Sequence, residues 1–220
     1  MCYTFDLLGP QFSAAHVAKC IDAFETEVAD GWICWAFSNH DVVRHVTRWS
    51  RPGDAPDAVA KFAIALIACL RGSICLYQGE ELGLEEAELR FEDLRDPYGI
   101  RFWPAFKGRD GARTPMVWET QAPNGGFTTG KPWLPVPAAH LRRAVDVEAA
   151  DPHSVLSRYR EVLAFRRAPN RRLLGEKSYT HTDSNSNLVL VRSRDAGMTW
   201  TKEPELIAAH PLGGSQDGRV

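Results

Sequence analysis

The residues most able to do chemistry are polar and acidic side chains that follow two short apolar runs. After the first run come Asn39, His40 and Asp41, and after the second come Glu80 and Glu81. A carboxylate beside a histidine can bind sugar hydroxyls, hold a metal ion, or carry out acid and base chemistry. On the pattern alone a second interpretation stays open, because the polar segment SNHD could simply cap a following helix.

The elements that must position these residues are two strands joined by a helix. Residues 32–38 and 73–77 are short and apolar and end in polar residues, which suits buried strands. Between them, residues 56–72 begin with proline, end with glycine and are apolar nearly all round, which predicts a long and deeply packed helix. This order predicts a right-handed parallel crossover unit. The carboxyl ends of parallel strands face the ligand crevice, so we expect both polar segments on one rim.

Other segments have weaker patterns. Residues 12–26 have helical spacing with Ser13 as the expected cap, and residues 155–167 predict a second helix. Residues 85–137 lose all periodicity, as is typical of a long functional loop. A run near residue 190 predicts a strand of a separate sheet, and beyond Asp195 no pattern persists.

Composition and charge exclude several classes of protein. The 220 residues carry a net charge of -2 and are 44% hydrophobic and 25% charged, which is ordinary for a globular protein. We expect no nucleic-acid partner, because there is no concentrated basic face, and no membrane partner, because no apolar segment is long enough. The five cysteines lack C-x-x-C spacing, so we expect buried thiols, no zinc site and a cytoplasmic location.

Three segments in one order, WAFSNHDVVRHVTRW, LYQGEELGL and KGRDGARTPMVW, resemble the α-glucosidase and oligo-1,6-glucosidase branch of glycoside hydrolase family 13, the α-amylase superfamily. The resemblance covers most of the chain. It implies an α/β fold, namely the C-terminal part of a (β/α)8 TIM barrel followed by the start of a small β-sandwich domain. Residues 1–150 would form the barrel portion, residues 151–195 a linking helix and the start of the β domain, and residues 196–220 an unpatterned tail.

The same resemblance assigns roles to individual residues. Asp41 matches the family's transition-state-stabilising aspartate, which binds hydroxyls next to the anomeric carbon, and His40 matches a histidine that binds the same sugar. Arg44 matches an arginine that flanks this sugar, although a structural pair with Asp41 or a nearby glutamate is an equal alternative. Asp110 and Arg113 lie in a loop that shapes the substrate entrance. Carboxylate contacts of this kind tighten as positive charge develops on the sugar.

The implied activity is retaining hydrolysis of terminal α-linked glucose from maltose-type or isomaltose-type oligosaccharides, with no cofactor and no metal. The family's nucleophile and general acid follow the fourth and fifth barrel strands, upstream of the matching region. The resemblance is therefore to a C-terminal fragment, which we expect to be inactive unless the missing N-terminal barrel half complements it. The alternatives are a non-catalytic remnant or partner-binding family 13-like chain, and an α-glucosyltransferase or isomerase of the same family.

Overall fold

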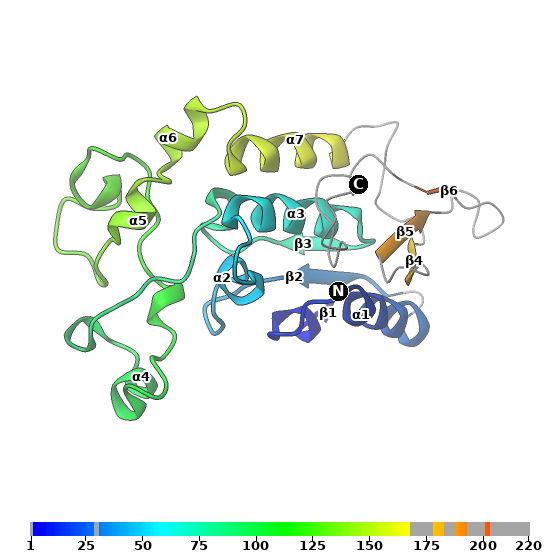
Figure 1. Cartoon of the computed structure of the whole chain (residues 1–220), viewed down its shortest axis with the longest axis horizontal. Coiled ribbons are helices and arrows are strands. Elements are labelled where there is room, and N and C mark those ends of the chain that lie inside the picture. The colour runs from blue at the N-terminus through cyan, green and yellow to red at the C-terminus, as the bar shows by residue number, and fades with distance from the viewer. Residues whose placement is uncertain (1, 29–30, 168–177, 183–187, 193–200, 203–220) are drawn as a thin grey trace. The chain divides into compact units, whose positions relative to one another are not determined.

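The structure, a computed structural model, describes residues 2–28, 31–167, 178–182, 188–192 and 201–202 (Figure 1). The chain forms two compact units, each described here by itself. The first unit comprises residues 1–36, 61–75 and 161–220, and the second comprises residues 37–60 and 76–160.

A three-stranded parallel sheet lies in the first unit. Its strands are β1 (Cys2–Tyr3), β2 (Ile33–Ala36) and β3 (Ser73–Cys75), paired in that order (Figure 1). Cys34 lies opposite Ser73 in the register. The predicted parallel pairing of the two apolar runs is confirmed, with strands shorter than the runs themselves. β1 is a further strand that the sequence pattern did not indicate.

Helix α1 (Ala14–Glu27) begins where its cap predicts. The Ser13 hydroxyl accepts the His16 amide at 3.2 Å and so satisfies one of the free N–H groups of the first turn. Val17, Ile21 and Phe24 lie on the buried face at helical spacing. The Phe24 ring meets the Trp35 ring edge-on at 5.8 Å between centroids, which ties this helix to β2.

Helix α3 (Pro56–Cys69) is the predicted apolar helix, and it begins in the second unit and ends in the first. Its residues from Val59 to Cys69 are buried except Lys61, which explains why the sequence is apolar on nearly every side. The chain then turns at Gly72, whose φ is +123°. A Cβ at that position would lie 2.6 Å from the Ile33 carbonyl oxygen, so the close approach requires glycine.

A second sheet of the first unit is antiparallel and contains β4 (Ser178–Thr182), β5 (Leu188–Arg192) and β6 (Thr201–Lys202) in that order. The predicted strand near residue 190, in a separate sheet, is confirmed. β6 lies within residues 196–220, where no pattern was expected. The rest of that stretch and the remainder of the expected β-sandwich lie outside the described residues.

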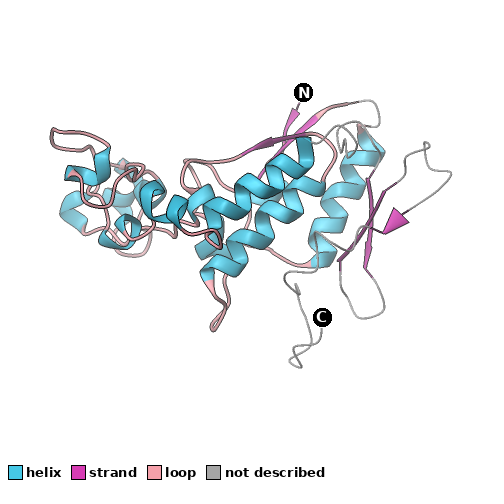
Figure 2. Ribbon diagram, turned by 90° about the horizontal axis from the view of Figure 1, so that it is seen from above, coloured by secondary structure: helices cyan, strands magenta, loops and turns pink. Residues whose placement is uncertain are grey.

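The second unit consists of short helices joined by loops (Figure 2), as the loss of periodicity between residues 85 and 137 predicts. Its core cluster contains Leu82, Leu84, Met116, Val117, Ala144 and Leu156. Besides the start of α3, its α-helices are α2 (His45–Trp49), α4 (Pro97–Phe102), α5 (Ala138–Leu141), α6 (Val145–Ala150) and the start of α7 (Val155–Arg167). The predicted helix over residues 155–167 is confirmed.

Two sequence expectations concern thiols and membranes. Cys20 and Cys69 are buried as expected, but Cys75 is exposed and Cys34 is half-buried, so the expectation of buried thiols is wrong for these two. Cys34 is the one residue of β2 that is not fully buried, and Cys75 is the exposed last residue of β3. No helix in the described part of the chain is long and apolar enough to cross a bilayer.

His140 is a buried neutral histidine whose environment predicts acid sensitivity. Its Nε2 lies 2.9 Å from the Glu85 carbonyl and its Nδ1 lies 3.3 Å from the Thr114 hydroxyl, and burial lowers its pKa from 6.5 to about 4. Protonating His140 therefore costs more free energy in the folded state than in the unfolded state. The contribution of neutral His140 to stability is complete above pH 6.5 and declines as the pH falls towards 4. From the lowered pKa we expect the free energy of unfolding to fall by about 3 kcal/mol over this pH range.

The measurement is urea unfolding at pH 7.5 and at pH 4.5 for the chain, for His140→Gln and for His153→Gln. His153 is exposed, so its variant should retain the acid-induced loss. His140→Gln should lack that component, whatever its stability at pH 7.5. An equal pH dependence in all three proteins would contradict this prediction.

Candidate active site

A tight turn follows β2 and presents two polar side chains to solvent. The Asn39 side-chain oxygen accepts the Asp41 amide at 2.8 Å, which closes the turn. The Ser38 hydroxyl accepts the amide of His45, the first residue of α2, at 2.9 Å. Ser38 thus satisfies a free amide at the start of α2, although the N-cap position itself is occupied by Arg44. The side chains of His40 and Asp41 remain 67% and 48% exposed, so both are available to a ligand.

Asp41 is the centre of a cluster of charges. Its Oδ1 accepts hydrogen bonds from Arg109 Nη1 at 2.9 Å and from Arg113 Nη2 at 3.1 Å. Arg113 also donates through Nε to the His40 carbonyl at 2.7 Å, and His40 Nε2 lies 3.4 Å from Asp41 Oδ2. Two guanidinium groups thus fix one carboxylate oxygen, while the other faces the histidine. A carboxylate held in this way is oriented before any ligand arrives.

Arg109 is itself held by a second carboxylate. Asp96, whose side chain is fully buried, accepts from Arg109 Nε and Nη2, both at 2.9 Å, and from the Arg109 amide at 2.9 Å. These bonds with Arg109, and an amide bond from Tyr98, lower the pKa of Asp96 to about 2. Arg109 therefore bridges a buried carboxylate to the exposed Asp41, and its free rotation is restricted.

Replacing Asp96 by asparagine should weaken this bridge. We expect the free energy of unfolding to fall by about 1.5–3 kcal/mol, because Arg109 loses its charge-assisted hydrogen bonds to a fully buried carboxylate. Urea unfolding of the variant at pH 7.5 measures the loss. Asp93→Asn is the matched control: Asp93 pairs with Arg90, which is 72% exposed, so its removal should cost less than about 1 kcal/mol. Equal losses in the two variants would show that the Asp96 bridge contributes no more than a surface pair.

Asp110, a predicted substrate-binding residue, has a different environment. It is 1% exposed, and its Oδ2 accepts the amides of Arg95 and Asp96 at 2.6 and 2.7 Å. Both bonds connect the loop around residue 110 to the segment that carries Asp96. A carboxylate used in this way positions the loop, so a direct contact with sugar is not what this geometry supports.

Arg44, the other predicted substrate-binding arginine, is also buried, at 1% exposure. Its Nη1 donates to the Gln78 carbonyl at 2.6 Å and its Nη2 donates to the Ala112 carbonyl at 2.9 Å. Neither group pairs it with Asp41, so the expectation of an Arg44–Asp41 pair is wrong; Arg109 and Arg113 occupy that carboxylate instead. Gly79, at φ +88°, makes room, since a Cβ there would lie 2.8 Å from Arg44 Nη1.

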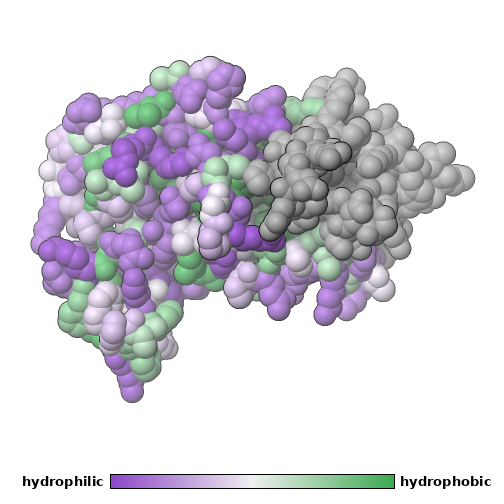
Figure 3. Space-filling model, viewed as in Figure 1, coloured by the Kyte–Doolittle hydropathy of each residue, from purple (hydrophilic) through white to green (hydrophobic). Residues whose placement is uncertain are grey.

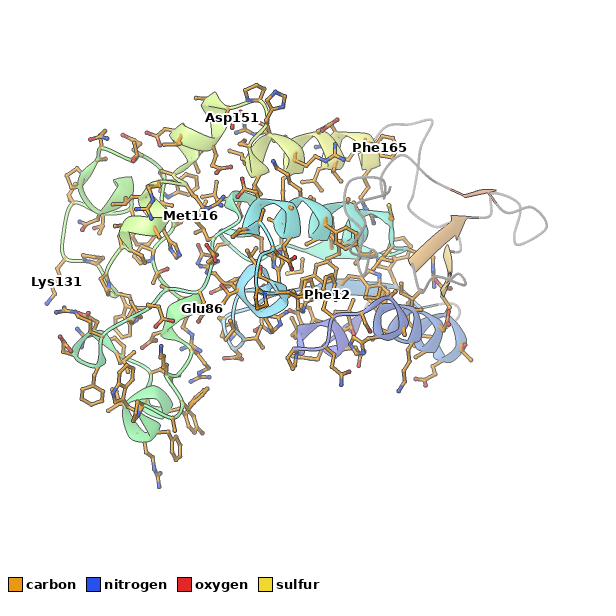
Figure 4. All side chains as sticks on the ribbon, viewed as in Figure 1. Phe12, Glu86, Met116, Lys131, Asp151 and Phe165 are labelled. Carbon is orange, nitrogen blue, oxygen red and sulfur yellow. The ribbon has the colours of Figure 1, made fainter. Side chains whose placement is uncertain are left out.

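Three acidic side chains act electrostatically on the Arg44 guanidinium. Burial lowers the pKa of Arg44, and the nearby carboxylates of Glu86, Glu80 and Glu81 act in the opposite direction. Figure 4 labels Glu86, whose carboxylate accepts the Arg44 amide at 2.9 Å and whose own amide donates to the Thr47 hydroxyl at 2.7 Å. These bonds join α2 to the segment that follows β3. The alternative of a structural role near glutamates therefore fits Arg44.

The acidic pair after β3 does not reach the exposed cluster. Glu80 is 3% exposed, and its Oε1 lies 3.5 Å from His45 Nδ1. Glu81 accepts the Gly79 amide at 2.8 Å and closes its own turn. The second polar segment thus supports the turn from inside the second unit.

In the part of the chain that the structure describes, no group of three or more histidine, cysteine, aspartate or glutamate side chains could hold a metal ion.

Exposed aromatic rings lie near the charged cluster. The rings of Tyr98 and Phe102 are nearly parallel at 6.4 Å, and the Arg109 guanidinium lies 5.5 Å from the Tyr98 centroid. Both rings are substantially exposed, at 58% and 47%. Figure 3 shows hydrophobic and hydrophilic side chains interspersed over α4, which carries these rings. The surface of α4 therefore presents two aromatic rings, one of them against the Arg109 guanidinium.

The structure brings together Asp41, His40 and Arg113, which the sequence reasoning named, and adds Arg109 and Asp96, which it did not name. The segment GRDGAR contained the needed signal, because two arginines four residues apart flank the single turn η4 (Asp110–Ala112) and reach the same carboxylate. Asp96 gave no comparable signal. Its partnership with Arg109 depends on two loop segments that only the folded chain brings together.

Comparison with known proteins shows the family of the chain. Residues 7–174 match the family described as alpha amylase, catalytic domain. A probable α-glucosidase of Rhizobium meliloti (strain 1021) is 54% identical over 83% of this chain and 33% of its own length. An oligo-1,6-glucosidase of Heyndrickxia coagulans is 32% identical over 70% of this chain and 31% of its own. The crystal structure of the α-glucosyl transfer enzyme XgtA has a TM-score of 0.81 and 49% identity, covering 88% of this chain and 36% of that one.

Fold and sequence together define part of an α-amylase catalytic domain, of α/β character. The chain belongs to glycoside hydrolase family 13, on its α-glucosidase and oligo-1,6-glucosidase branch. It spans about a third of the length of the curated relatives it matches.

Proposed function

We propose that this chain supplies the transition-state-stabilising part of an α-glucosidase active site, with β2 and β3 as the seventh and eighth strands of a (β/α)8 barrel. The observation that carries the proposal is Asp41, which is exposed and yet fixed through Oδ1 by two arginines. It lies in the turn that follows the carboxyl end of a parallel strand, the end from which such barrels present catalytic groups. The substrate class is an oligosaccharide with a terminal α-linked glucose.

Each residue then has a defined part in the reaction. Asp41 accepts hydrogen bonds from hydroxyls next to the anomeric carbon, and these bonds strengthen as the oxocarbenium-like charge develops. His40, beside it, donates to the same sugar. Arg113 holds Asp41 and borders the ligand, whereas Arg44 and Asp110 position the two loops. The nucleophile and the general acid, which must lie about 5–5.5 Å apart, come from the preceding part of the barrel.

A chimera tests the proposal. In the Rhizobium meliloti relative, the matching 183 residues are replaced by this chain, and hydrolysis of p-nitrophenyl α-glucoside is measured. We expect the chimera to turn over substrate and the chain alone to show only buffer background, because it lacks two of the three carboxylates. A folded but inactive chimera would favour the non-catalytic alternative, and turnover by the chain alone would overturn the assignment.

Glucosyl transfer is a second candidate, favoured by the 49% identity to the α-glucosyl transfer enzyme XgtA. Hydrolysis and transfer share a glycosyl-enzyme intermediate and differ in whether water or a sugar hydroxyl accepts the glucosyl group. Incubating the chimera with maltose separates them. Glucose as the sole product indicates hydrolysis, while saccharides longer than maltose indicate transfer.

A further inference from the structure

A short turn in the second unit contains three consecutive residues with left-handed backbone. They are Asn124, Gly125 and Gly126, with φ of +52°, +64° and +73°. Within the described part of the chain, Asn124 is the single residue other than glycine with a positive φ. An L residue avoids this conformation unless its surroundings hold it there. The contacts of Asn124 therefore determine whether the turn stays closed.

The turn engages both amide groups of the Asn124–Gly125 pair in hydrogen bonds. The Asn124 side chain donates through Nδ2 to the Thr128 carbonyl and to the Gly130 carbonyl, both at 2.9 Å. The Gly125 backbone amide donates to the Ala122 carbonyl at 3.0 Å. These bonds fix the Asn124 side chain and the backbone nitrogen that follows it.

An asparagine followed by glycine has a reaction of its own, hydrolytic deamidation. The Gly125 nitrogen attacks Asn124 Cγ, so a nitrogen–carbon bond forms, the Cγ–Nδ2 bond breaks, and Nδ2 leaves as ammonia with the Gly125 amide proton. Water then cleaves one of the two carbonyl–nitrogen bonds of the resulting succinimide and leaves aspartate or isoaspartate at position 124. Glycine favours the first step because it has no Cβ and permits a wide range of backbone angles.

We propose that Asn124 is a deamidation site that the native turn protects and that reacts, with water as co-reactant, when the turn opens. For the attack, the Gly125 nitrogen must leave the Ala122 carbonyl, and the Asn124 amide must leave both of its acceptors. The closed turn thus restrains the nucleophile and the leaving group together. These contacts lie wholly within the second unit, and the reaction is independent of the proposed glucosidase activity.

The products cannot rebuild the turn. An aspartate carboxylate has no N–H to donate, so it would present negative charge to the two carbonyls that accept from Asn124. Isoaspartate adds a methylene group to the main chain directly before Gly125, which is buried. A Cβ at Gly125 would already lie 3.1 Å from the side chains of Val117 and Leu141, so a displaced backbone has little room there. An opening that ends in reaction is therefore irreversible.

The first test compares the folded and the unfolded chain. The full chain is incubated in mildly alkaline buffer, with and without urea above its unfolding transition, and deamidation is followed by peptide mass mapping and enzymatic isoaspartyl methylation. We expect Asn124 to react at least about tenfold more slowly in the folded chain, because the rate follows the population of the opened turn. A peptide of residues 119–130, measured in both solvents, corrects for any effect of urea on the reaction. Equal corrected rates would overturn the protection.

Opening the turn without unfolding the chain gives a second test. Gly126→Ala places a side chain at a φ of +73° and leaves the Asn124–Gly125 pair intact, so the native-state rate at Asn124 should rise by about tenfold. Gly53→Ala is the matched control, because Gly53 has a φ of +96° in a separate turn of the second unit. Its rate should equal that of the parent. No increase in Gly126→Ala, or the same increase in both variants, would contradict the proposal.

Asn124→Asp tests the product directly. We expect faster hydrogen exchange of the Gly125 amide and of the Trp118 amide, which donates to the Gly125 carbonyl at 2.7 Å. Exchange in α1, in the first unit, should be unchanged. If both amides keep their protection, the turn tolerates the product and the claim of irreversibility is wrong.

Discussion

Asp41→Asn in the chimera should lower kcat/KM for p-nitrophenyl α-glucoside by about 10²–10³-fold, in line with losing one electrostatic contact to a developing charge. Asparagine keeps the size of the side chain but lacks the negative charge that two arginines orient and that the oxocarbenium-like transition state requires. Since the contact strengthens mainly in the transition state, kcat should fall in the same proportion as kcat/KM.

The control for this variant is Asp22→Asn, an exposed aspartate on α1 in the first unit. Its steady-state constants should match those of the unmodified chimera. Circular dichroism and the urea midpoint of Asp41→Asn show whether the loss is catalytic. A rise in KM with unchanged kcat would contradict the assigned role, because it would mean that Asp41 binds ground state and transition state equally.

Arg44→Met should lower the free energy of unfolding by about 3–5 kcal/mol, because it removes a buried charged donor and leaves its hydrogen-bond acceptors unpaired. The variant leaves the Gln78 and Ala112 carbonyls without their donors. It also removes the positive charge that faces Glu86, Glu80 and Glu81. Methionine has a similar length, so the effect of an empty cavity is kept small.

Urea unfolding of the full chain measures this effect, with Arg51→Met as the control. Arg51 is exposed, and its replacement should change stability by less than about 0.5 kcal/mol. The same experiment separates the two interpretations of Arg44. If Arg44 contacted sugar instead of supporting the fold, its variant would keep the stability of the parent and raise KM in the chimera.

The acidic pair after β3 illustrates where pattern reasoning stops. The sequence placed Glu80 and Glu81 on the same rim as Asp41, and the parallel strand pairing behind that inference is confirmed. Glu80 nevertheless turns inward to His45, and Glu81 accepts the Gly79 amide. The end of a strand determines where the backbone leaves the sheet. The turn that follows determines which side chains face solvent. That turn depends on Gly79 and on the buried Arg44 guanidinium lying against it.

The amino-acid sequence by itself determined the parallel strand–helix–strand unit, the helices α1 and α7, and the family. Apolar runs, the Ser13 cap and the Pro56 start are local signals, and three ordered motifs identify glycoside hydrolase family 13. The tertiary structure decided which arginines serve Asp41, since Arg109 and Arg113 reach it across more than sixty residues and the competing Arg44 is buried elsewhere. The periodic spacing of apolar residues shows which face of a segment packs against the elements next to it. Partners in distant irregular loops are chosen by packing and by the cost of leaving a buried charge unpaired, which no local pattern encodes.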